Sequence, residues 1–241
     1  MTARRTPQIL TVNAVVVALA VAYGYVTGDP GAAFGETGFV TFFSCAQLAT
    51  IAFVCDRIGR ERRGAVATRA AASGARIWRL MALGFAFLAL DEVAQIHEKL
   101  DYLAHTLFIG EETALSDRLD DLIVGAYAAV GLWVMHHYRG ELTRHRAMRP
   151  FLVAGFVLLG VMVVLDALTN RADLVGLVFE DRATMRTVLG AASVCEDGLK
   201  LAAEGVFLAG FLAVRARAAE PRSPSSLRPV SGGVSPQEPL N

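Results

Sequence analysis

The stretch Phe85–His105, FAFLALDEVAQIHEKLDYLAH, decides the fold of this chain. Its first half is as apolar as a helix that faces lipid. The second half then carries polar and ionisable residues with no turn signal, among them Asp91, Glu92, Gln95, His97, Glu98, Asp101 and His105. Because ionisable groups inside a membrane segment are costly, they usually face the protein interior and mark a functional site. We therefore expect the rest of the chain to supply scaffold and partner groups for this helix.

The composition is that of a multi-pass membrane protein. Hydrophobic residues make up 54% of the 241 residues, mean hydropathy is +0.44, and the apolar residues come in long blocks. The formal net charge is zero. The chain contains no phosphate-binding glycine loop and no nucleic-acid signature, so we expect the lipid bilayer as a partner and no nucleic acid. Its three cysteines show no metal-ligand spacing and no disulfide framework.

Six apolar blocks are long enough to cross a bilayer as helices. They cover Ile9–Thr27, Gly38–Ile58, Ile77–Leu100, Leu119–Tyr138, Phe151–Thr169 and Ala191–Val214. In lipid only helices or closed barrels satisfy the backbone, so residues 1–217 are predicted to form an all-α bundle of about six transmembrane helices. Residues 218–241 are rich in Pro, Ser and Gly and are predicted to be a disordered cytoplasmic tail.

The arginines give the orientation of this bundle. They occur before the first block and then in alternate loops, while the remaining loops are acidic or mixed. By the positive-inside rule, the arginine loops and both termini are cytoplasmic. We expect a multi-pass protein of the cell (plasma or inner) membrane. His136, His137 and His145 lie among these arginines and are expected to face headgroups or water.

With this orientation, the intramembrane acids fall in one layer. Asp91 lies roughly 21 Å along its helix from the cytoplasmic side, and Asp166 roughly 24 Å along the fifth. The sixth helix carries Glu196, Asp197, Lys200 and Glu204 in its outer half, and the fourth begins with Arg118, Asp120 and Asp121. We therefore predict one polar site in the outer half of the bundle, where Lys200 can neutralise a neighbouring acid.

The helical period also predicts the directions in which the polar side chains point around each helix. At about 100° per residue, Asp91, Gln95, Glu98 and His105 share a stripe, flanked by His97 and Asp101, whereas Glu92 points elsewhere. The four charged residues of the sixth helix fit within about 100° of arc. Each helix can thus present a polar face to the bundle and an apolar face to lipid.

Several carboxylates with a histidine suit a divalent transition metal such as Zn, Mn or Fe. The predicted ligands are Asp91, His97, Glu98, Asp101, Asp166, Glu196 and Glu204. Residues 97–101 read HExxD, which resembles in part the HExxH pattern of zinc metalloproteases, with Asp101 in place of the second histidine. The di-iron motif Glu-x-x-His is absent.

Two motifs on two different predicted helices together carry a looser resemblance to known proteins. The helix with Asp91, Glu92, His97 and Glu98, read DExxxxHE, precedes a helix with Glu196, Asp197 and Glu204, read ED…E. This combination resembles uncharacterised bacterial multi-pass membrane proteins, and the resemblance implies no activity.

Two classes of function fit these residues. The first is a metal-dependent membrane enzyme, such as a hydrolase of a lipid or other apolar small molecule, with a spare carboxylate (Glu98 or Glu92) as base. The second is an ion or proton translocator that uses the same acids as a relay. A relay should extend toward the cytoplasm, yet the inner halves of the helices hold almost no ionisable groups, which favours a site open to one side. A scaffold or partner-binding protein is the third alternative, and oligomeric state is not indicated.

Overall fold

The computed structural model describes residues 5–29, 31–35, 38–64, 69–109, 119–169 and 181–219. The described elements are α1 (Arg5–Thr27), α2 (Phe39–Gly64), α3 (Arg69–Ala94), α4 (Ile96–Ala104), the π-helix η2 (His105–Ile109), α5 (Leu119–His137), α6 (Arg139–Arg144), the 3-10 turn η4 (Arg146–Met148), α7 (Arg149–Thr169) and α9 (Arg182–Ala219). No strand occurs in these ranges, so the predicted all-α class is confirmed for them. The predicted tail beyond residue 219 and most of the outer loop after Ile109 lie outside the described residues.

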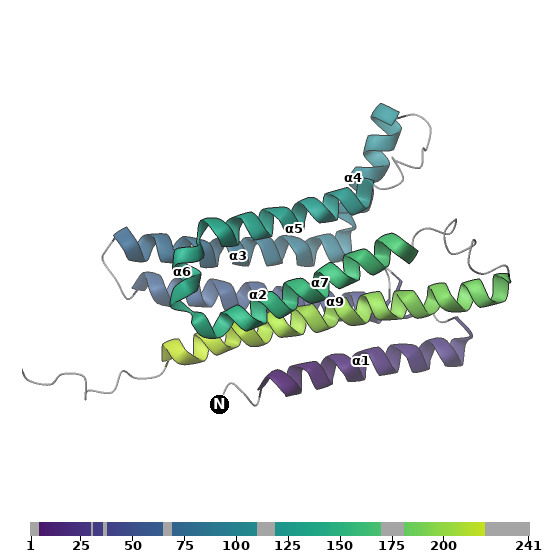
Figure 1. The fold of residues 1–241 in the computed structure, drawn as a ribbon, viewed down its shortest axis with the longest axis horizontal. Helices are drawn as coiled ribbons and strands as arrows, with labels where there is room; N and C mark the ends of the chain where they lie inside the picture. Colours follow the sequence, from purple (N-terminus) through teal and green to yellow (C-terminus); the bar gives the residue numbers. More distant parts are fainter. Residues whose placement is uncertain are drawn as a thin grey trace, which may run out of the picture.

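The long helices run side by side (Figure 1). α9 packs against α1, α2 and α7, while α2 and α3 form a second close pair and α5 lies beside α3. α4 turns away from this direction at one end of the bundle. Every predicted apolar block thus has a helical counterpart. Through its contacts, α9 joins α1 and α7 to the pair formed by α2 and α3.

The main core lies between α2, α3 and α9, with η4 and α7 closing it. Trp78 of α3 and Phe211 of α9 are almost fully buried and pack edge to face, with ring centroids 6.2 Å apart. Phe85 and Phe207 extend this aromatic cluster. Close packing of such large rings supplies dispersion contacts between α3 and α9, and the edge-to-face pairs add to them.

The outward faces are apolar as well. Large side chains stay exposed along α1, α5 and α7, including Leu19 (60%), Trp133 (63%) and Val153 (64%). A water-soluble monomer rarely exposes apolar surface on this scale. Among the described residues, three helices are long and apolar enough to cross a membrane, namely Arg5–Thr27, Phe39–Arg63 and Arg146–Asp166, with a shorter apolar helix at Leu122–His137. The fold is therefore that of a membrane protein, and the finer prediction of six spans goes beyond these three helices.

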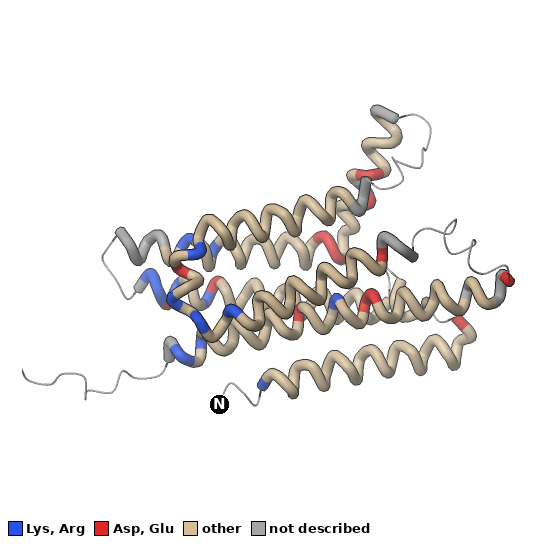
Figure 2. The backbone as a smooth tube through the Cα atoms, in the orientation of Figure 1, with Lys and Arg blue, Asp and Glu red and all other residues tan. Residues whose placement is uncertain are grey.

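The charges are segregated along the bundle (Figure 2). Most described Lys and Arg positions gather at the end where α2 ends and α7 begins, which we call the arginine end. Most Asp and Glu positions lie in the other half, which we call the acidic half. The alternating arginine loops of the sequence therefore come together in space.

The predicted span Ile77–Leu100 is wrong as a single helix, because α3 ends at Ala94 and α4 begins at Ile96. The prediction that Asp91, Gln95, Glu98 and His105 share one stripe is also wrong, because it was made for a continuous helix. Two other boundaries also differ. Helical structure continues past Leu100, the predicted end of that block, through η2 to Ile109, and α9 extends well beyond Ala191–Val214 at both ends. At 38 residues, α9 is about 57 Å long, so it exceeds a hydrocarbon core of roughly 30 Å.

Candidate functional site

The break between α3 and α4 is made by Gln95. Its backbone is left-handed, with φ 51° and ψ 49°, and among the described residues it is the one non-glycine position with positive φ. Such a conformation costs a non-glycine residue roughly 1–2 kcal/mol and often persists at functional sites. No glycine or proline accompanies the break, which explains why no turn signal is visible in the sequence there.

Side chains satisfy the backbone groups that the break frees. Asp91 Oδ1 accepts the backbone N–H of His97 at 3.0 Å. On the other side of the break, Lys99 Nζ donates to the carbonyl of Ala94 at 2.7 Å. An aspartate that bonds nearby backbone offers the chain an alternative to continuous helix. Asp91 and Lys99 thus stabilise the kink from both sides.

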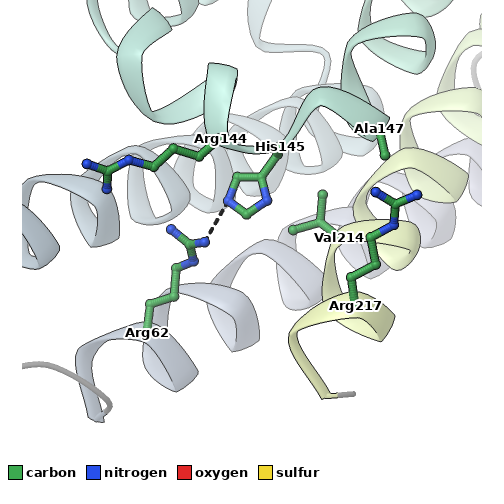
Figure 3. Close-up of a pocket in the computed structure, with 6 residues that line it drawn as sticks. All are labelled: Arg62, Arg144, His145, Ala147, Val214 and Arg217. Atoms are coloured by element: carbon green, nitrogen blue, oxygen red, sulfur yellow. Dashed lines mark hydrogen bonds between the residues drawn. The ribbon is translucent and has the colours of Figure 1, made fainter. Parts of the chain in front are cut away.

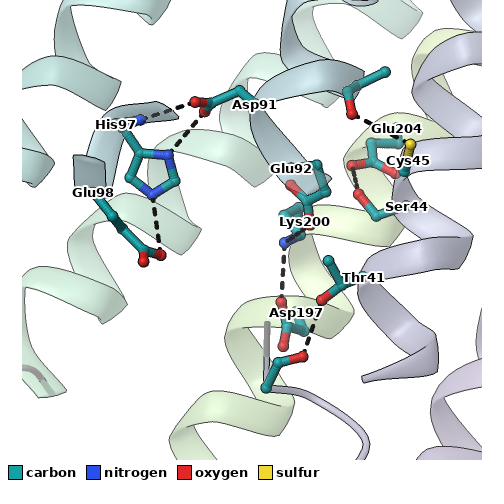
Figure 4. A network of polar contacts seen from close by, with 12 residues as sticks. Thr41, Ser44, Cys45, Asp91, Glu92, His97, Glu98, Asp197, Lys200 and Glu204 are labelled. Atoms are coloured by element: carbon teal, nitrogen blue, oxygen red, sulfur yellow. Dashed lines mark hydrogen bonds and ion pairs between the residues drawn. The ribbon is translucent and has the colours of Figure 1, made fainter. Parts of the chain in front are cut away.

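The same aspartate orients the His97 ring. Asp91 Oδ2 lies 2.9 Å from His97 Nδ1, and the Asp91 side chain is almost fully buried. An ionised carboxylate accepts only, so this bond places a proton on Nδ1. The other ring nitrogen, Nε2, lies 3.7 Å from Glu98 Oε1 (Figure 4). His97 is therefore held with Nε2 directed toward a second carboxylate.

A cavity of about 160 Å³ lies beside the kink. It is lined by Phe34, Thr41, Glu92, Gln95, His97, Glu98 and Lys200. These residues come from α2, α3, α4, α9 and the segment between α1 and α2, so distant parts of the chain build one pocket, which we call the kink pocket. Polar groups converge on it and one aromatic ring closes it, as is common in small-molecule sites.

Lys200 balances part of the negative charge of the kink pocket. Its Nζ lies 2.6 Å from Glu92 Oε1 and 3.2 Å from Asp197 Oδ1, and all three side chains are largely buried. The prediction that Lys200 neutralises a neighbouring acid is confirmed. The prediction that Glu92 points elsewhere is wrong, because Glu92 faces α9 and bonds Lys200.

Glu204 lies one turn further along α9. It is buried, and its Oε1 accepts a hydrogen bond of 2.6 Å from Ser44 of α2. Its other oxygen, Oε2, has no hydrogen-bond partner among the described residues. Nearby, Cys45 donates to the carbonyl of Ala89 at 3.2 Å. The polar side chains of α2 thus link α3 and α9 within the bundle (Figure 4).

Toward the arginine end this polar region gives way to apolar packing. Phe207 and Phe211 are the next buried aromatic groups on α9, and Trp78 and Phe85 of α3 meet them. In the part of the chain that the structure describes, this core consists of apolar side chains together with the buried thiol of Cys55. The kink pocket and its network are therefore separated from the arginine end by an apolar layer.

The other predicted ligands stand apart from His97. Glu204 bonds Ser44, Asp101 lies 3.2 Å from His105 Nδ1, and Asp166 and Glu196 are half-buried and do not line the kink pocket. Within the described ranges, no three His, Cys, Asp or Glu side chains lie close enough together to hold a metal ion. The predicted set is thus distributed over several small polar contacts.

Several polar residues of the network were missed by sequence reasoning. Thr41, Ser44 and Cys45 of α2 each take part in it or line the pocket, and Gln47 is buried with both amide atoms unpartnered in the described part of the chain. The sequence does contain a pattern that points to them, because residues spaced by three and four lie on the same face of a helix. A small polar face on an otherwise apolar helix was the pattern to find.

Fold and site together define an all-helical membrane protein with a polar pocket at a kink in one helix. The chain belongs to the family described as a domain of unknown function (DUF8692), whose model matches residues 8–215. No curated protein and no solved structure matches the chain. The match names no activity, and the resemblance to uncharacterised bacterial multi-pass proteins stays a prediction.

Proposed function

We propose that the chain crosses the cell membrane six times, with α1, α2, α3, α5, α7 and α9 as spans and both termini in the cytoplasm. The gathering of arginines at one end supports this topology, since positive loops stay cytoplasmic. Reporter fusions after Arg60 and Arg146 are expected to report the cytoplasm, and fusions after Asp29 and Ala114 the outside. The reverse pattern, or two neighbouring loops on one side, would contradict the topology.

We propose further that the kink pocket is the active site of a membrane enzyme of the hydrolase class, with His97 as the group that transfers protons. The observation that carries this proposal is the pair of bonds from buried Asp91 to His97, which fix the ring and its proton. A histidine held in this way by a carboxylate is suited to general acid–base work at Nε2. Glu98 is placed to share that proton transfer, and Glu92 is held by Lys200.

A lipid or another apolar small molecule with a polar group is the substrate class that fits. The pocket joins polar side chains to Phe34, and exposed apolar faces surround the bundle. A substrate dissolved in the bilayer can place its apolar part against such faces and its polar group beside His97. The apolar layer toward the arginine end fits a site that opens to one side only.

The sequence favours an enzyme that depends on a divalent transition metal (Zn, Mn or Fe), and we include this metal in the proposal. His97 Nε2 and Glu98 would supply two ligands, and Asp91 would orient the histidine through its bond to Nδ1, as carboxylates behind metal-binding histidines do. Catalytic zinc sites usually have three protein ligands, so a metal needs Asp101 or Glu92 to turn toward His97. Metal analysis of the purified wild type and of His97→Ala tests it: stoichiometric metal lost in the variant is expected.

The enzymatic role is tested on cell membranes. Lipids and apolar metabolites from cells that express the wild type, His97→Gln or His137→Gln are compared by mass spectrometry. A product present with the wild type and the exposed control His137→Gln, but absent with His97→Gln, is expected. Equal profiles for all three proteins, with equal expression, would contradict the enzyme.

An ion or proton translocator is the second candidate, and buried Glu204 with its unpartnered oxygen favours it. Proton flux into proteoliposomes, measured for the wild type and Glu204→Gln, decides between the two. The apolar layer around Phe207 and Phe211 leads us to expect no flux above that of protein-free vesicles.

A further inference from the structure

A second cavity, of about 230 Å³, lies at the arginine end (Figure 3). It is lined by Arg62, Arg144, His145, Ala147, Val214 and Arg217. These residues come from α2, α6, η4 and α9 and from the turn between α6 and η4. We call it the arginine pocket, and nothing in the proposed enzymatic chemistry uses it.

Positive charge exceeds negative charge around the arginine pocket. Buried Glu141 pairs with Arg62 through Oε1 and with Arg144 through Oε2, the latter at 2.9 Å. Gly74 of α3 leaves the room that this carboxylate occupies, since a methyl group there would come within 2.9 Å of it. No carboxylate pairs with Arg217 in the described ranges. Three guanidinium groups therefore face one carboxylate.

His145 completes the lining as a fixed hydrogen-bond donor. Its ring packs edge to face on Trp78 at 5.5 Å, and its Nε2 lies 2.7 Å from Arg62 Nη2. Arginine can only donate, so Nε2 accepts and the ring proton is on Nδ1. Burial, together with the positive charge of Arg62, lowers the pKa of His145 and keeps the ring neutral. Nδ1 lies on the side of the ring nearer Val214 (Figure 3). The expectation that His145 faces headgroups or water is wrong, whereas His136 and His137 are exposed.

We infer that the arginine pocket binds a phosphate group, either of an anionic phospholipid headgroup or of a soluble phosphate. Guanidinium groups bind phosphate oxygens through paired, charge-assisted hydrogen bonds. Basic pockets between helices at the cytoplasmic membrane surface are typical sites for anionic headgroups. Arg217 supplies a charge that no carboxylate of the described residues neutralises, and Arg62 and Arg144 are already positioned by Glu141.

The experiment is thermal unfolding of the purified full chain in a non-ionic detergent. Three ligands are titrated separately: dioleoylphosphatidylglycerol, dioleoylphosphatidylcholine and inorganic phosphate. The test variant is Arg217→Gln, which leaves the Glu141 pairs intact and so should fold. The control variant is Arg139→Gln, an exposed arginine of α6 at the same end that does not line the pocket.

Stabilisation by phosphatidylglycerol, but not by zwitterionic phosphatidylcholine, is expected for the wild type and Arg139→Gln. Arg217→Gln should need a roughly tenfold higher lipid concentration for the same shift, the effect of losing one charge-assisted hydrogen bond. The same pattern with inorganic phosphate alone would support the site with a soluble ligand. No stabilisation by either anion, or equal weakening by both substitutions, would overturn the inference, because general surface charge would then suffice.

Discussion

Asp91 bonds His97 twice, once at the backbone N–H and once at the ring, across a helix break at the residue between α3 and α4. One carboxylate therefore does two things: it replaces a lost helical hydrogen bond, and it fixes a histidine in the kink pocket. The geometry of the pocket depends on the break, because a continuous helix would give His97 N–H to a backbone carbonyl four residues earlier.

The two bonds of Asp91 are separable by substitution. Asp91→Ala removes both and should lower the free energy of unfolding by about 1 kcal/mol, as loss of a helix cap does. Asp91→Asn keeps an oxygen for the His97 N–H, so it should cost less stability while it alters the ring contact. Chemical or thermal unfolding in detergent measures both. If Asp91→Ala unfolds like the wild type, the side chain does not stabilise the kink.

Lys200 is expected to be the most sensitive charge in the bundle. Lys200→Met leaves Glu92 and Asp197 close together without a counter-charge and should destabilise the protein by about 3 kcal/mol. Adding Glu92→Gln should recover roughly 1 kcal/mol of this loss, since the two residues are coupled. Lys99→Met, at an exposed lysine, should cost no more than about 1 kcal/mol. Simple additivity of Lys200→Met and Glu92→Gln would contradict the pairing.

The free energy of unfolding should decrease as the pH is lowered, because of His145. Burial and the neighbouring Arg62 lower the pKa of His145 in the folded protein, while the unfolded chain titrates at the ordinary value of about 6.5. The unfolded state then binds more protons below that value, so the free energy of unfolding declines as pH falls through it. His145→Gln should flatten the unfolding temperature between about pH 7 and pH 5 relative to the wild type.

The matched control for this pH effect is His137→Gln, since His137 lies at the same end but is exposed. It should leave the slope of unfolding temperature against pH unchanged. Equal slopes for the wild type and His145→Gln would show that His145 does not couple folding to protons.

Two glycines of α7 give a test of helix packing. A methyl group on Gly155 would overlap the Phe207 ring of α9, whereas no atom of the described residues lies within 4 Å of one on Gly160. Gly155→Ala should therefore destabilise by about 1–3 kcal/mol through overpacking. Gly160→Ala should be neutral or stabilise by up to about 1 kcal/mol, because alanine is the better helix former. Equal effects of the two changes would contradict the close approach of α7 and α9.

The sequence by itself determined much of the architecture. Long apolar blocks predict helices because only helices bury their own backbone polar groups in lipid. The alternation of arginine loops likewise predicted that these residues gather at one end, as Figure 2 shows. The pairing of Lys200 with an acid followed from its neighbours on one helix, since Asp197 lies three residues away.

The tertiary structure alone decided the site. Periodicity assumes a continuous helix, and the left-handed backbone at Gln95 rotates everything after it, so the facing of His97 and Glu98 could not be read from spacing. The partner of Glu92 is 108 residues away in the chain, and the partner of Glu204 is 160 residues away. The arginine pocket likewise depends on α2, α6, η4 and α9, and these elements meet only when α9 packs against α2 and η4. Local pattern fixes which residues are polar and at what depth, whereas contacts between distant helices depend on how their side chains pack.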